Sequence, residues 1–108
     1  MFFHKDLTKE KWQSMSFFEQ MANIGAEIGR TINWQKKDKE LSIASFYRGV
    51  ELLDETIEDK KNRKKLKELC RLREMLADHF VYDNIYNSSD EKWNSYFYAF
   101  NYAVAIKR

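Results

Sequence analysis

The chain contains no proline, three glycines and one cysteine. Because proline and glycine are the residues that most often interrupt helices and end strands, their scarcity favours long helices over a sheet. A single cysteine excludes an internal disulfide and a cysteine-rich zinc site, and it favours a reducing compartment. We expect Cys70 to lie on the apolar side of its helix as a small buried residue.

Long apolar runs are also missing. The longest stretch without a charged residue covers residues 93–106, and its fourteen residues are too few to span a bilayer. The first residues of the chain contain no apolar run of the length found in signal peptides. We therefore expect a cytoplasmic protein with no membrane segment.

What is present is the composition of a folded domain. Of the 108 residues, 44% are hydrophobic and 16% are aromatic, which argues against disorder although 33% are charged. This length fits one domain with its own core. No repeat or low-complexity linker divides the chain, so we expect residues 1–108 to form a single helical-bundle domain.

Apolar residues recur at helical spacing along most of the sequence. The expected helices cover residues 17–35, 39–57, 63–81 and 90–107. A short helical turn that carries Trp12 precedes them, and Ser16 with Glu19 and Ser88 with Glu91 match the capping-box pattern. Short connections between long helices favour antiparallel neighbours. The predicted fold is all-α, an up-down antiparallel four-helix bundle with a short N-terminal helical turn.

The helical spacing also predicts which residues face the core. In the first helix, the spacing Gly25-x-x-x-Gly29 would let another helix approach closely, with Glu27 on the opposite, outer side. The expected core residues of the two middle helices are Ile43, Phe46, Tyr47, Val50, Leu53, Ile57, Leu66, Leu69, Leu72, Leu76 and Phe80.

The last helix is apolar on more than one side. Its expected core stripe consists of Trp93, Tyr96, Phe97, Phe100, Ala103 and Val104. Tyr98, Tyr102 and Ile106 form a second stripe near the opposite side, and a four-helix bundle leaves one side of each helix in water. This stripe therefore needs a cover. The candidate covers are an N-terminal segment with Phe2, Phe3, Leu7 and Trp12, a second copy of the chain, a partner protein, or nucleic-acid bases stacked on the tyrosines.

Positive charge is concentrated in one segment, although the formal net charge is only +2. Residues 60–67 hold six cations in eight positions, and an up-down bundle places this connection beside both chain termini. The predicted basic end consists of Lys60, Lys61, Arg63, Lys64, Lys65, Lys67, Lys107 and Arg108. It is a candidate site for RNA, DNA or an acidic partner protein, and the simpler alternative is a solvated turn.

Arg73 lies near the centre of the apolar stripe of its helix. A buried guanidinium requires a partner, and Asp54 on the core side of the preceding helix is the best candidate, so we predict a buried Arg73–Asp54 ion pair. His79 lies at the edge of the stripe, about 120° from Arg73 on an ideal helix. The side chains of Arg73 and His79 should therefore not meet within one chain.

The spacing Arg73-x5-His79 resembles the R-x(4–6)-H motif of the HEPN superfamily, small all-helical proteins of which many are metal-independent RNases. The resemblance covers these two residues and the all-α architecture, and it departs at Glu74, where the family often has Asn, Asp or His. It implies an alternative function, RNA cleavage, with His79 as acid/base and Arg73 steadying the scissile phosphate. The whole chain is similar to small bacterial and phage helical proteins through "FFEQMANIGAEIGR" and "YFYAFNYA", which implies no activity.

No other catalytic pattern occurs. His4 and His79 are the only histidines, and the sequence contains no Glu-x-x-His pair, glycine-rich phosphate loop or nucleophile elbow. We therefore expect no metal and no cofactor. The leading hypothesis is a non-enzymatic binding or accessory protein that forms a homo-oligomer through Tyr98, Tyr102 and Ile106. A purely structural subunit is the third alternative.

Overall fold

The structure is a computed structural model that describes residues 8–106. Its helices are α1 (Lys9–Ser14), α2 (Phe17–Trp34), α3 (Lys39–Glu58), the 3-10 helix η1 (Lys60–Lys65), α4 (Leu66–Phe80) and α5 (Asp90–Ile106). The predicted all-α class is confirmed, and the described part of the chain contains no strand. The expected N-terminal turn is a complete short helix, α1, and the expected third helix begins with the 3-10 segment η1.

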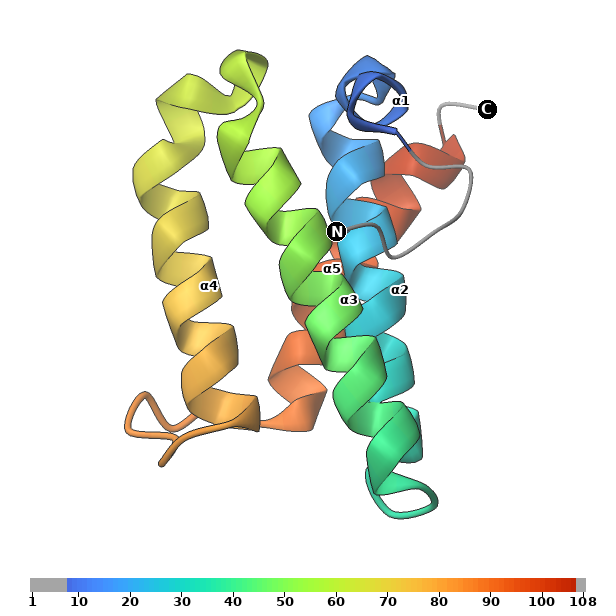
Figure 1. Cartoon of the computed structure of the whole chain (residues 1–108), viewed down its shortest axis with the longest axis vertical. Helices are drawn as coiled ribbons and strands as arrows, with labels where there is room; N and C mark the ends of the chain where they lie inside the picture. Colours follow the sequence, from blue (N-terminus) through green and yellow to red (C-terminus); the bar gives the residue numbers. More distant parts are fainter. Residues whose placement is uncertain (1–7, 107–108) are drawn as a thin grey trace.

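The long helices run in alternating directions along the chain (Figure 1). α3 packs against both α2 and α4, while α5 packs against α2 (Figure 1). α1 and η1 lie at one end of the molecule, and the α2–α3 connection and the α4–α5 loop lie at the other (Figure 1). Because α5 packs mainly on α2 and α4 mainly on α3, the regular four-helix bundle expected from the sequence stays a prediction.

Side-chain caps set where the helices begin. Ser16 and Glu19 form the predicted capping box: the Glu19 N–H donates to Ser16 Oγ (3.1 Å), and the Ser16 N–H donates to Glu19 Oε1 (2.9 Å). The second predicted capping box is wrong, because Ser89 caps α5 in place of Ser88. The backbone N–H and C=O of Ser88 are instead bound by the side chain of Asn84.

The core is one apolar cluster to which all five α-helices contribute. Its buried members are Trp12, Met21, Ile24, Ile28, Phe46, Leu52, Leu53, Leu69, Leu72, Leu76, Trp93 and Phe97. The predicted close approach of a helix is confirmed at Gly25, where an added Cβ would lie 2.7 Å from the Cβ of Phe97. It is wrong at Gly29, where an added Cβ would meet nothing within 4 Å.

α3 packs on α2 through a face that includes small residues. The small buried residues of α3 are Ser42, Ser45, Gly49 and Thr56. An added Cβ at Gly49 would lie 3.3 Å from the Cβ of Glu27, which is buried and paired with Arg48 (3.4 Å) rather than on the outer side as predicted. This packing turns α3 so that Ile43 and Tyr47, predicted to be buried, are 53% and 56% exposed.

Three further predictions of burial are wrong. Leu66 and Cys70 on α4 and Tyr96 on α5 are exposed. α4 packs mainly on α3, and Leu66 and Cys70 lie on a side of α4 that this contact does not cover. Apolar residues at helical spacing therefore predict the helix, but they do not predict how much of its surface other helices cover.

The loop between α4 and α5 is organised by the buried side chain of Asp78. Its carboxylate accepts hydrogen bonds from the backbone N–H groups of Ile85 (2.9 Å) and Tyr86 (3.0 Å). Asn84 and Asn87 both have φ of 55°, in the left-handed region that asparagine adopts more readily than most residues. These contacts fix the path of the chain into the first turn of α5.

Candidate functional site

The outer face of α5 (Tyr98, Tyr102 and Ile106) is the apolar surface that was predicted to need a cover. The three residues are 66%, 57% and 64% exposed, and the two tyrosine rings stack with centroids 6.4 Å apart. Trp12 does not cover them, because it is buried in the core. The other N-terminal residues proposed as a cover, Phe2, Phe3 and Leu7, lie outside the described residues.

A groove runs beside this outer face, between α2 and α5. Its volume is about 390 Å³. Ala22, Ala26, Asn101 and Ala105 lie in its walls, together with Met15, Asn23, Val104 and one charged residue, Glu19. Asn101 and Ala105 follow Tyr98 and Tyr102 by three residues, so they are their neighbours on the helix surface. An exposed aromatic stripe and a groove whose walls include three alanines therefore lie next to each other.

The basic end is only partly free to bind a ligand. Lys61 is ion-paired with Asp59 and donates to the backbone carbonyl of Gln13 (3.0 Å), and the Lys65 ammonium lies 4.8 Å from the ring centroid of Phe17. Of the predicted basic end, Lys60, Arg63, Lys64 and Lys67 are exposed and have neither an acidic partner nor an aromatic contact within the described residues. The predicted members Lys107 and Arg108 lie outside the described residues.

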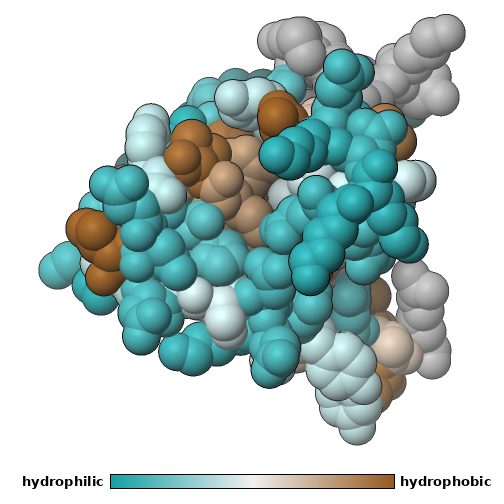
Figure 2. Space-filling view, turned by 90° about the horizontal axis from the view of Figure 1, so that it is seen from below, coloured by the Kyte–Doolittle hydropathy of each residue, from teal (hydrophilic) through white to brown (hydrophobic). Residues whose placement is uncertain are grey.

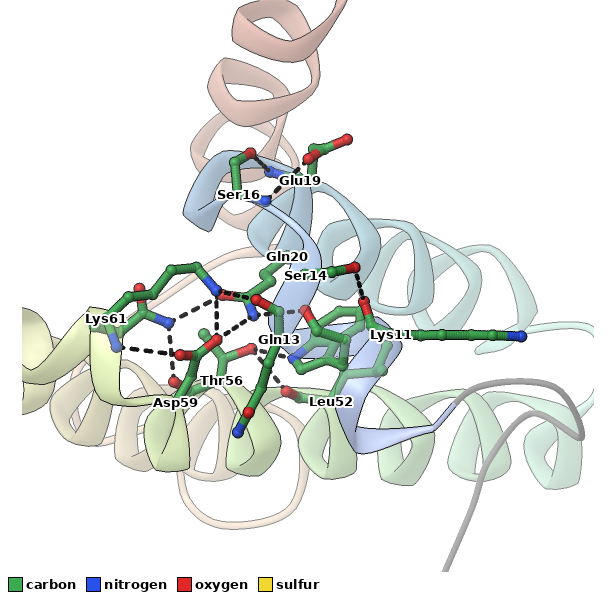
Figure 3. Close-up of polar contacts among 12 residues, drawn as sticks. Lys11, Gln13, Ser14, Ser16, Glu19, Gln20, Leu52, Thr56, Asp59 and Lys61 are labelled. Atoms are coloured by element: carbon green, nitrogen blue, oxygen red, sulfur yellow. Dashed lines mark hydrogen bonds and ion pairs between the residues drawn. The ribbon is translucent and has the colours of Figure 1, made fainter.

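A buried polar network, which was not predicted, ties this end together (Figure 3). Gln20 is fully buried, and its amide donates to the Trp12 carbonyl (3.0 Å) and to Asp59 Oδ2 (2.9 Å). Asn62 donates to Gln20 Oε1 (2.9 Å), and Trp12 Nε1 donates to Thr56 Oγ1 (3.0 Å). The network joins α1, α2, α3 and η1, so its role in holding the fold accounts for these buried polar groups.

Asp59 is the charged member of this network. Burial acts to raise its pKa, but hydrogen bonds from Lys61 and Gln20 outweigh burial, and the pKa of Asp59 is lowered from 3.8. Asp59 also accepts a hydrogen bond from the backbone N–H of Lys61 (3.1 Å), which caps η1. One lysine of the basic end is thus used to stabilise a buried carboxylate.

Arg73 and Asp54 form the predicted ion pair, with Nε 2.6 Å from Oδ1, but the predicted burial is wrong. The two side chains are 47% and 42% exposed. Arg73 faces water because α4 packs mainly on α3 and no other helix covers this side. The hydrogen bond that Arg73 donates to Asp54 raises the pKa of Arg73, so the guanidinium stays charged.

His79 takes part in a different set of contacts from Arg73. Its Nε2 lies 2.9 Å from Asp90 Oδ1, its ring packs edge-on against Phe80, and its side chain is 12% exposed. Its Nδ1 is buried without a hydrogen-bond partner in the described structure. As expected from the helical wheel, the structure does not bring Arg73 and His79 together within one chain.

A larger pocket, here called the His79 pocket, opens at the end of the molecule opposite the basic end. It has a volume of about 700 Å³ and lies between α2, α3 and the two ends of the α4–α5 loop. Its apolar wall includes Ile43, Phe46, Tyr47 and Phe80. Figure 2, which looks at this end, shows apolar surface bordered by hydrophilic residues. This pocket was not predicted from the sequence, because its residues come from four separate segments of the chain.

Several classes of site find no support in the described part of the chain. Residues 8–106 contain no group of three or more His, Cys, Asp or Glu side chains placed to hold a metal ion. Within the same range, every helix is too short or too polar to cross a bilayer. No protein-family model, curated protein or solved structure matches the chain.

Proposed function

We propose that this protein is a non-enzymatic binding module, an up-down antiparallel four-helix bundle that forms a homo-oligomer through the outer face of α5. The observation that supports this most directly is the exposure of Tyr98, Tyr102 and Ile106 on a helix with no charged residue between positions 93 and 106. An exposed helix face normally carries charged side chains. A neutral face with stacked aromatic rings is typical of a surface that a protein buries.

A second copy of the chain suits this face better than a charged partner does. In a two-fold contact each patch meets its own copy, so a charged patch would repel itself, whereas this patch carries no charge. The shape of the surface, with a groove between α2 and α5, also supports a contact between two copies. Because this groove lies beside the aromatic stripe, one two-fold axis can place the tyrosines of each protomer against the groove of the other.

The mass of the protein in solution tests this proposal. Light scattering across a range of concentrations should give a multiple of the 13.1 kDa chain mass. A single mass of one chain at every concentration would contradict the proposal. The measurement should use the full chain, since Phe2, Phe3 and Leu7 were predicted as an alternative cover for the outer face of α5.

We propose the basic end as the site for an anionic partner, with nucleic acid as the first ligand to try. Lys60, Arg63, Lys64 and Lys67 support this because none is neutralised by an acidic partner in the described structure. Phosphate binding by such a cluster weakens steeply as salt rises. Titration of labelled RNA and DNA at low and high salt tests it, and the absence of binding at low salt would overturn it.

The RNase alternative has weaker support. His79 is largely buried and bound to Asp90, whereas Arg73 is bound to Asp54, so the chemistry would need a second copy to bring the two residues together. Incubation with RNA beside the His79→Ala variant distinguishes the two functions. We also propose a cytoplasmic location, supported by the single cysteine, and a purely structural subunit remains the alternative if neither surface binds.

A further inference from the structure

The His79 pocket has the size and lining of a small-molecule site. Its volume of about 700 Å³ lies within the range of ligand pockets, roughly 300–1,000 Å³. The rings of Phe46 and Phe80 form part of its wall, with their centroids 5.5 Å apart. Ile43 and Tyr47 lie at its edge and are more than half exposed, so a bound ligand would remove apolar surface from water.

The ionisable side chains that line the pocket are two carboxylates and one histidine. Asp90 and Glu91, in the first turn of α5, are its carboxylates, and no lysine or arginine lines it. His79 is its one basic side chain, and its Nε2 is already bound to Asp90 (2.9 Å). Glu91 is exposed and has no hydrogen-bond or ion-pair partner among residues 8–106. One carboxylate is therefore held in place, and a second is free beside an aromatic wall.

We propose that the His79 pocket binds a small organic cation, an amine or guanidinium carried on an aromatic or aliphatic body. The body lies against Phe46, Phe80 and Ile43, where burial of apolar surface provides most of the affinity. The cationic group pairs with the Glu91 carboxylate and contacts the ring of Tyr47, since aromatic faces and carboxylates both attract ammonium and guanidinium groups. An anionic ligand with the same aromatic or aliphatic body is repelled by the two carboxylates.

Three probes with the same body and different charge test this proposal: phenethylamine, 2-phenylethanol and phenylacetate. Each is titrated into the ¹⁵N-labelled full chain and followed by the backbone amide shifts. Phenethylamine should bind most tightly, with shifts concentrated at Phe46, Val81 and Glu91, and phenylacetate most weakly. Equal affinity of the amine and the alcohol, shifts centred on another part of the molecule, or no saturable binding of any probe would overturn the proposal.

Two matched variants test whether the Glu91 carboxylate binds the cationic group of the ligand. Glu91→Gln should weaken binding of phenethylamine by about threefold to fivefold, as expected for one partly exposed ion pair, and leave binding of 2-phenylethanol unchanged. Asp83→Asn removes an exposed acid from the neighbouring loop, outside the pocket, and should change neither affinity. Both residues are exposed, so neither substitution should disturb the fold. The backbone amide spectrum of each variant checks this. An equal effect of the two substitutions would contradict binding to Glu91.

Discussion

Gly25 of α2 lies directly against Phe97 of α5. A Cβ atom added to Gly25 would be 2.7 Å from the Cβ and 2.9 Å from the Cγ of Phe97, so at this crossing the two helices are too close for any other residue. The contact buries Phe97 and thereby sets the rotation of α5. Trp93 faces the core on the same side, while Tyr98 and Tyr102 face outward.

Gly25→Ala should therefore destabilise the fold by about 1–3 kcal/mol, because either α5 or the Phe97 ring has to shift. Gly29→Ala is the matched control, since its added methyl group meets nothing within 4 Å. That substitution should be neutral or stabilise the helix by up to about 1 kcal/mol. Urea unfolding of both variants measures the difference. Equal midpoints would show that α5 does not pack on α2 in this way.

Asp59 should make stability depend on pH in the acid range. Its pKa is lower in the folded protein than the ordinary value of 3.8, so the folded state binds fewer protons than the unfolded state between these two values. The stabilising contribution is complete above pH 3.8 and is lost as the pH falls through the folded-state pKa. Asp59→Asn should accordingly destabilise the protein at neutral pH.

Urea unfolding of wild type and Asp59→Asn at a series of pH values checks this dependence. The difference in the free energy of unfolding should shrink as the pH falls below 3.8. A difference that stays constant to the most acid pH at which the protein is folded would contradict the proposed role of the Asp59 carboxylate. Asp38→Asn, at an exposed cap, provides a comparison outside the polar network.

The Arg73–Asp54 ion pair should contribute little to stability. Both side chains are more than 40% exposed, and exposed ion pairs are typically worth less than about 1 kcal/mol. A double-mutant cycle with Arg73→Ala and Asp54→Ala should give a coupling energy below that limit, and it should fall further at high salt. A coupling of several kcal/mol, as for a buried pair, would mean that this side of α4 is covered in solution.

Local signals in the sequence predict the helices well. Ser16 and Glu19 mark the start of α2, and the observed bounds Phe17–Trp34 differ by one residue from those expected. The stripe formed by Tyr98, Tyr102 and Ile106 also lies outward as predicted. These features depend on residues within a few positions of one another, so periodicity and capping are sufficient to find them.

Features that depend on distant segments could not be predicted in the same way. Gln20 and Asp59 are 39 positions apart, and nothing near either residue indicates that they share a hydrogen bond. Ile43 and Tyr47 match an apolar face, but the close contact of Gly49 with α2 turns that face away from the core. The His79 pocket requires the positions of α2, α3 and the α4–α5 loop together, so only the folded structure reveals it.

We propose that the outer face of α5 joins two copies of the chain. Sedimentation velocity of two single variants tests this contact most directly. Tyr102→Ser removes one aromatic ring from that face, and Tyr82→Ser removes an exposed ring from the α4–α5 loop as the matched control. Tyr102→Ser should weaken self-association by about tenfold or more, because a two-fold contact contains the substitution twice. Tyr82→Ser should associate like wild type. Equal association constants for both variants and wild type would contradict the account.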